Sequence, residues 1–227
     1  MDALLAFAAA LLALRLAGLL ARRWRVARRP ELAAWAWSLA AYAVAAAAIA
    51  WGESAQWDAR AFRVYYAAGA LVTVPLLGAG SLLLAGVRRA GPVACVVAGI
   101  GVGVALAMPV HGGFAQHGIP PAQDHLGWVP RALAIAVNSV GTLAVLGVAL
   151  RSLRRRPLGN SLIVLGVAAA ALGSGLAGLG AGGAAIGIAA GVALLYAGFT
   201  VPSSRTVTKP QHLDDRPAEA MSDRRKS

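Results

Sequence analysis

Residues 1–29 read MDALLAFAAALLALRLAGLLARRWRVARR and contain the two features that decide the fold. A run rich in Ala and Leu comes first, and a cluster of arginines follows it: Arg22, Arg23, Arg25, Arg28 and Arg29. An apolar helix of about 20 residues crosses a hydrocarbon core of about 30 Å, and cytoplasmic loops carry the excess of Arg and Lys. The stretch therefore predicts a spanning helix with a cytoplasmic carboxyl end. Because Asp2 precedes the apolar run and the positive charge follows it, we expect an uncleaved anchor rather than a signal peptide.

The composition of the whole chain also points to lipid. Of its 227 residues, 59% are hydrophobic and 13% are charged, whereas soluble domains have about 25% charged residues. The mean hydropathy is +0.67, so the apolar faces need lipid around them. The single cysteine, Cys95, excludes an internal disulfide and cysteine-based zinc motifs. The net charge of +12 lies in clusters between apolar runs, which favours membrane orientation over nucleic-acid binding.

The pattern predicts an all-α membrane protein with about seven transmembrane helices, because lipid leaves no partner for an unpaired backbone amide. The expected spans are residues 3–21, 32–51, 64–87, 92–110, 131–150, 161–179 and 183–201. Only Gly180, Gly182 and Gly183 separate the last two, so one long interrupted segment is the alternative there. We expect residues 1–202 to form this domain and residues 203–227, which are polar and carry both charges, to form a disordered cytoplasmic tail.

The connections between the spans alternate in charge. Arginines follow the first, third and fifth expected spans. After the third span they are Arg88 and Arg89, and after the fifth they are Arg151, Arg154, Arg155 and Arg156. The intervening connections carry both signs or almost no charge. This alternation predicts an external N-terminus, a cytoplasmic C-terminus and a place in the plasma membrane.

A short motif occurs twice, as ARRPEL after the first span and RRRPLGN after the fifth. Two parallel three-helix units joined by a linking helix would explain it, and such repeats occur in some transporters. The alternative is that a basic turn followed by proline at a helix start is a common cytoplasmic connection.

Charged residues are scarce inside the expected spans. No Asp or Glu lies in the middle of a span and no span contains Lys, which disfavours a carboxylate-driven pump and a retinal protein. Arg15 lies near enough to the inner end of its expected span to extend its guanidinium to the interface. The uncharged polar residues are expected mainly to join helices: Ser38, Tyr42, Thr73, Ser81, Asn138, Ser139, Thr142, Ser174 and Tyr196. Asn138 has the most hydrogen-bonding groups to satisfy.

Two sets of glycines recur at every fourth residue: Gly99 and Gly103, and Gly183, Gly187 and Gly191. Such stripes let helix backbones approach closely in lipid. They predict tight packing within the bundle or, alternatively, the face of a homo-oligomer or of a contact with another membrane protein.

Two candidate sites lie on the expected outer side. The rings of Trp57, Tyr65 and Tyr66 are typical of a membrane interface. Together with Arg60 and Arg63, they are also candidates for binding a lipid headgroup or an anionic ligand. Within the same span, Pro75 should kink the helix.

A long loop on the same side supplies candidate metal ligands: His111, His117, Asp124 and His125. Their spacing matches no ligand motif, so a solvated loop is the alternative. The chain has no GxSxG, HExxH or phosphate-loop motif. The sequence therefore predicts neither a catalytic site nor a cofactor.

Three stretches carry a resemblance: FRVYYAAGALVTVPLLGAGSLLLAG at 62–86, the segment from NSVGTLAVLG to GSGLAGLG at 138–180, and GVALLYAGF at 191–199. With these stretches the chain resembles a group of bacterial, largely actinobacterial, multi-span membrane proteins of unknown function. The resemblance covers a little over half of the chain and implies a shared architecture without an activity.

Two functions follow as hypotheses. The first is a structural or accessory membrane component, not an enzyme, that assembles through its glycine-rich helix faces. The second is a facilitator for a small neutral or lipidic molecule, with a path lined by Asn138, Thr142, Ser38 and Tyr42.

Overall fold

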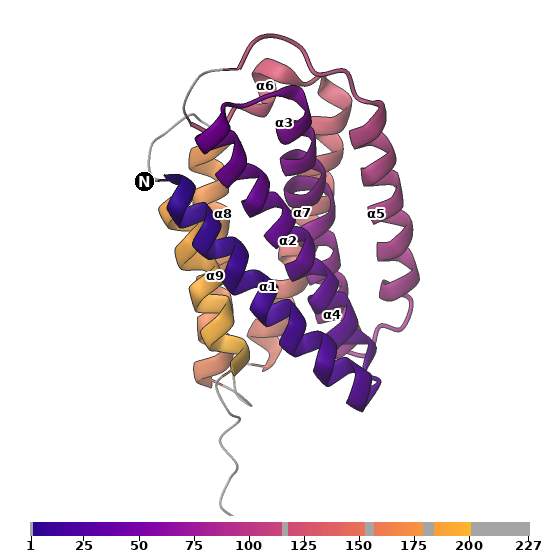
Figure 1. The fold of residues 1–227 in the computed structure, drawn as a ribbon. Coiled ribbons are helices and arrows are strands. Elements are labelled where there is room, and N and C mark those ends of the chain that lie inside the picture. The colour runs from indigo at the N-terminus through magenta and orange to yellow at the C-terminus, as the bar shows by residue number, and fades with distance from the viewer. Residues whose placement is uncertain (1, 115–117, 153–156, 179–183, 201–227) are drawn as a thin grey trace, which may run out of the picture.

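The computed structural model describes residues 2–114, 118–152, 157–178 and 184–200. Within these ranges the chain is all-helical and contains no strand, and the long helices lie side by side in a bundle (Figure 1). The prediction of an all-α fold is thereby confirmed for the described residues.

Ten helical elements make up the described chain. They are α1 (Asp2–Ala27), α2 (Pro30–Ala55), α3 (Ala59–Tyr65), the π-helix η1 (Tyr66–Thr73), α4 (Val74–Leu84), α5 (Ala90–Ala107), α6 (Ala122–His125), α7 (Trp128–Ser152), α8 (Pro157–Gly178) and α9 (Ala184–Thr200). The elements α3, η1 and α4 follow one another without a break and form a single long rod.

Five helices are long and apolar enough to cross a membrane: Ala3–Ala27, Pro30–Ala55, Ala59–Leu84, Ala90–Ala107 and Trp128–Arg151. They correspond to the first five expected spans. The last two expected spans fall in α8 and α9, whose apolar stretches are shorter, Pro157–Ala170 and Ala189–Gly198. A count of seven spans stays a prediction, and the expected tail at 203–227 lies outside the described residues.

The helix ends follow from local sequence. Pro30 and Pro157 each begin a helix, as expected of a residue without an amide hydrogen. Between α1 and α2, Arg28 has a φ of 53° and its amide donates to the Trp24 carbonyl at 2.8 Å, which reverses the chain within two residues, 28 and 29. At the other end of α2, the Asp58 carboxylate caps α3 by accepting from the Ala61 amide at 2.7 Å.

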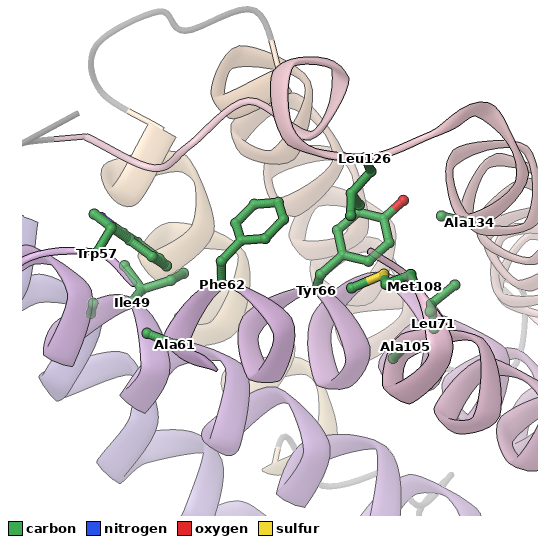
Figure 2. Close-up of a cluster of buried hydrophobic side chains, with 11 residues drawn as sticks. Ile49, Trp57, Ala61, Phe62, Tyr66, Leu71, Ala105, Met108, Leu126 and Ala134 are labelled. Atoms are coloured by element: carbon green, nitrogen blue, oxygen red, sulfur yellow. The ribbon is translucent and has the colours of Figure 1, made fainter. Parts of the chain in front are cut away.

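Two clusters of buried apolar side chains hold the bundle together. One lies around the fully buried Phe62 and joins α2, α3, η1, α5 and α7 (Figure 2). The other contains Leu16, Trp35, Leu77 and Val145, and it joins α1, α2, α4 and α7 to the α8–α9 pair. The alanine-rich face of α1 packs against α2 and α9.

Glycines bring several of these helices into backbone contact. A Cβ built on Gly187 would lie 2.8 Å from Gly173 Cα, and one on Gly198 would lie 2.8 Å from the Gly159 carbonyl oxygen. Later residues of α9 thus contact earlier residues of α8. The two helices are therefore antiparallel neighbours rather than one interrupted helix. On α7, a Cβ at Gly141 would lie 2.6 Å from the Val74 carbonyl oxygen, so α4 and α7 touch there without intervening side chains.

The contact at Gly141 leads to a stability prediction. We expect Gly141→Ala to destabilise the protein by about 1–3 kcal/mol, because the added methyl meets backbone atoms that cannot move aside. Thermal unfolding of the purified protein in detergent measures the effect. On the same helix a Cβ at Gly147 would meet nothing within 4 Å, so Gly147→Ala is the matched control. Equal unfolding temperatures for the two variants would contradict the close α4–α7 contact.

Candidate functional site

The hydrogen-bonding pattern of the rod formed by α3, η1 and α4 changes near its middle. The π-helix η1 covers residues Tyr66–Thr73, so amides there bond to carbonyls five residues back instead of four. The next donor in that pattern would be the amide of residue 75, paired with the Ala70 carbonyl. Pro75 has no amide hydrogen, so the carbonyl of Ala70 loses its donor inside the bundle.

Asn138 of α7 supplies the missing donor. Its Nδ2 donates to the Ala70 carbonyl at 2.8 Å. From the other side, the buried Ser38 hydroxyl of α2 donates to the Thr73 carbonyl at 2.7 Å, and the Thr73 hydroxyl donates to the Ala68 carbonyl at 2.7 Å. Asn138 thus replaces the amide that Pro75 lacks, while Ser38 adds a hydrogen bond from α2 to the same rod. The Oδ1 atom of Asn138 is buried, and no described residue donates to it.

The aromatic residues proposed for a membrane interface, Trp57, Tyr65 and Tyr66, are buried or half-buried in the bundle. Trp57 is buried beside Gly52, and its Nε1 donates to the Glu53 carboxylate at 3.3 Å. Figure 2 shows Phe62 and Tyr66 on successive turns, and their stacked rings lie 6.1 Å apart. The Tyr66 hydroxyl donates to the Pro130 carbonyl at 3.2 Å, which ties the third span to the start of α7. Tyr65 is half-buried, with its ring edge-on to Trp57 at 5.9 Å.

The two candidate arginines differ. Arg60 is exposed at the outer end of α3. Arg63 is half-buried, and its Nη2 donates to the carbonyl of Met108 at 3.0 Å. Met108 directly follows the last residue of α5, and the helix dipole favours a cation at this C-terminal end. Arg63 therefore anchors the C-terminal end of α5 to α3.

The candidate metal ligands are only partly brought together. The backbone amide of His111 donates to the His125 carbonyl at 3.0 Å, and the His125 Nδ1 lies 2.9 Å from the His111 carbonyl oxygen. The buried His125 ring stacks on Phe114 with 4.5 Å between centroids, while Asp124 is exposed. His117 lies outside the described residues. Among the residues that are described, no group of three or more His, Cys, Asp or Glu side chains is placed to hold a metal ion.

The two glycine stripes have different surroundings. Gly187 and Gly191 are packed on α8, the latter with its Cβ position 2.8 Å from Ala170, while Gly183 lies outside the described residues. Around Gly99 and Gly103 of α5, a Cβ would meet nothing within 4 Å. Cys95 and Ala107 extend this stripe by one turn in each direction, and both are exposed.

The rings of three residues that the sequence does not pair, Phe62, Phe114 and His125, pack on one another. The Phe62 and His125 centroids are 5.3 Å apart, and Phe62 is fully buried. The clustering of aromatic residues around the predicted interface was the available signal, but 62 and 125 are too far apart in the chain for spacing to pair them.

A scan against protein-family models, a search of curated proteins and a search of solved structures found no match to this chain. The candidates for function are therefore the features described above: the repaired π-helix, the aromatic outer end and the open α5 stripe. Hydrogen bonds to backbone carbonyls and close packing dominate these features, and the aromatic end also includes the charged side chains of Glu53 and Arg63.

The pairing of Asn138 with Pro75 can be tested by a double-mutant cycle. We expect Asn138→Ala to lower the stability by about 1 kcal/mol, because a carbonyl inside the bundle loses its donor. In a Pro75→Ala background the same change should cost less, since an alanine at that position provides its own amide. Thermal unfolding in detergent measures both effects, with Ser139→Ala at the adjacent exposed position as the control. If Asn138→Ala lowers the stability equally in both backgrounds, Asn138 does not replace the amide missing at Pro75.

Proposed function

We propose that the chain is a multi-pass component of the bacterial plasma membrane that assembles with a second copy of itself through the open face of α5. The observation that carries this proposal is the stripe of Cys95, Gly99, Gly103 and Ala107, all exposed and one turn apart. It is a structural or accessory role rather than an enzymatic one.

The stripe lies opposite the side of α5 that packs on the bundle. The buried positions of α5 are Ala90, Ala94, Gly101 and Ala105. At about 100° per residue, Gly99 and Gly103 point away from these positions. Figure 1 places α5 at one edge of the bundle, where it contacts mainly α4 and η1. A second chain can therefore reach the stripe without displacing any described helix.

The small side chains distinguish this face from an ordinary lipid-facing surface. The helices α5 and α7 are equally exposed, since 22% of the apolar part of each is buried in the bundle. The exposed residues of α7 include the large side chains of Ile135, Leu143 and Leu150. Lipid chains are as apolar as leucine, so helices associate in a bilayer by close van der Waals contact, which a groove of small residues permits. On α5 such a groove is bordered by Val96, Ile100, Val102 and Leu106, which are exposed and can pack beside it in a partner.

Arginine distribution supports the orientation that we propose, with seven spans, the N-terminus outside and the C-terminus in the cytoplasm. The turn between α1 and α2, the turn between α4 and α5, and the end of α7 lie at one end of the bundle (Figure 1). Their arginines are exposed: Arg22, Arg23, Arg25, Arg28, Arg29, Arg88, Arg89 and Arg151. The opposite end carries both signs, with Glu53, Asp58 and Asp124 beside Arg60, Arg63 and Arg131.

A facilitator for a small neutral or lipidic molecule is the second candidate. The observation that favours it is the π-helix η1 in the middle of the rod, because π-helical turns occur frequently at functional sites, together with the buried Oδ1 of Asn138. Against it, Ser38, Thr73 and Asn138 all donate to backbone carbonyls. These donors serve the helix ladder, which favours assembly as the role of the bundle.

Cross-linking through Cys95 tests the assembly. Two copies with the same orientation are related by a two-fold axis along the membrane normal, so the two Cys95 residues face each other near that axis. A disulfide needs the Cα atoms to lie about 4.4–6.8 Å apart. We expect mild oxidation of native membranes to give a covalent dimer, and Gly99→Leu or Gly103→Leu to reduce its yield several-fold.

The controls use positions outside the stripe. Cys95→Ser should abolish the covalent dimer, while Gly147→Leu, which fills an equally open glycine of α7, should leave its yield unchanged. A dimer that forms equally well with leucine at position 99 or 103 would exclude the α5 face.

The proposed orientation leads to a separate prediction. Reporter fusions after Arg29, after Asp124 and at the C-terminus should report cytoplasmic, external and cytoplasmic locations, because the arginine-rich connections stay inside. Paired reporters that are active only on one side of the membrane provide the measurement. A cytoplasmic location for the Asp124 fusion would contradict the topology.

A further inference from the structure

Arg15 is a charged residue near the middle of a membrane-spanning helix. The helix α1 runs from Asp2 to Ala27, so Arg15 is 13 residues from its start and 12 from its end. At about 1.5 Å per residue, it lies about 18 Å from the end of the helix at Ala27. The expected span ended at residue 21, and α1 continues for another six residues to Ala27, three of which are arginines: Arg22, Arg23 and Arg25.

The side chain of Arg15 projects away from the protein. The buried face of α1 consists of Ala6, Ala9, Ala10, Ala13, Leu16, Ala17 and Leu20. Arg15 is exposed on the opposite face. In the described chain the one ion pair joins Arg29 to the buried Glu31, and no described residue accepts a hydrogen bond from Arg15. A guanidinium facing lipid without a partner is costly, so a partner that the described helices do not supply is expected.

Three neighbours on the same face complete a cationic groove. Arg22 is seven residues from Arg15, which places it two turns along and within about 20° of the same direction. Arg25 follows one turn later, and both arginines are exposed. Between Arg15 and Arg22 lies Gly18, where a Cβ would meet nothing within 4 Å. Gly18 therefore leaves one side of the surface between Arg15 and Arg22 open, and the exposed Leu19 borders it on the other side.

Helix direction places this groove under Arg22. In an α-helix each Cα–Cβ bond tilts toward the N-terminus, so a side chain covers the turn before its own Cα. For Arg22 and Arg25 this tilt leads back toward Gly18. For Arg15 the same tilt leads toward the N-terminus of α1, so its long side chain has to turn back along the helix to bring the guanidinium to a phosphate over Gly18.

We propose that Arg15, Gly18, Arg22 and Arg25 form a binding site on α1 for the phosphate group of an anionic lipid. Guanidinium groups match phosphate oxygens with paired N–H donors, and such charge-assisted hydrogen bonds are stronger than neutral ones. The phosphodiester rests over Gly18 between Arg15 and Arg22, its negative charge compensates Arg15, and its acyl chains continue along the apolar surface of α1. The site does not depend on assembly through α5.

Lipid titration of the purified full-length protein in neutral detergent tests the site. Bound lipid is counted by native mass spectrometry with phosphatidylglycerol, with zwitterionic phosphatidylcholine and with inorganic phosphate as the probes. We expect phosphatidylglycerol to bind preferentially. Arg15→Leu should weaken it about tenfold or more, since a charge-assisted contact is lost. Gly18→Leu should weaken it similarly while keeping every charge.

Matched controls separate a site from diffuse charge. Arg151→Leu removes an exposed arginine from the same end of the bundle, and Gly147→Leu fills an open glycine of α7. Both should leave phosphatidylglycerol affinity within about twofold of the unaltered protein. Equal losses in Arg15→Leu and Arg151→Leu, unchanged binding in Arg15→Leu and Gly18→Leu, or binding of inorganic phosphate without the lipid would each overturn the proposal.

Thermal unfolding checks that the variants fold. Without added lipid, Arg15→Leu should unfold at the same or a higher temperature, because leucine suits a lipid-facing position better than arginine. Phosphatidylglycerol should raise the unfolding temperature of the unaltered protein and should raise that of Arg15→Leu less. A full stabilising effect of the lipid on Arg15→Leu would show that Arg15 is merely tolerated, and would also overturn the proposal.

Discussion

The bundle depends on the requirement that every backbone carbonyl inside it keeps a hydrogen-bond donor. Pro75 breaks this rule in the third span by removing the amide that would serve Ala70. The hydrogen bond from Asn138 Nδ2 to the Ala70 carbonyl, 2.8 Å long, restores it from a neighbouring helix. Because the Ser38 hydroxyl of α2 also donates to the Thr73 carbonyl, the rod is held between its neighbours on two sides. Polar residues in this bundle act first as parts of the helix ladder.

Close packing is the second constraint, and glycine serves it in two ways. Inside the bundle, Gly78 and Gly141 let α4 and α7 meet backbone to backbone, and Gly187 and Gly191 do so for α8 and α9. On α5 the same residue type leaves a groove that no described helix fills. Glycines at the same spacing are therefore covered on α9, where α8 packs on them, and uncovered on α5, where no described helix does.

Charge is separated along the bundle rather than paired within it. Exposed arginines gather at one end, and the described chain contains one ion pair, between Arg29 and Glu31. Cations of this kind find their counter-charges in the surroundings, and anionic lipid headgroups are the nearest source in a bilayer. Arg15 extends that requirement into the apolar part of α1. The orientation that we propose and the lipid site that we propose therefore have the same electrostatic origin.

The sequence by itself determined the helical class, the positions of the five long apolar helices and the starts of α2 and α8 at Pro30 and Pro157, because apolar run length and proline chemistry act locally. It also pointed to Asn138, since an amide among apolar residues needs partners. Only the tertiary structure decided that this partner is Ala70, that Trp57 and His125 pack inward, and that one glycine stripe is covered while the other is open. These outcomes depend on which helices become neighbours, and contacts between residues as distant as 70 and 138 leave no periodic signal in the chain.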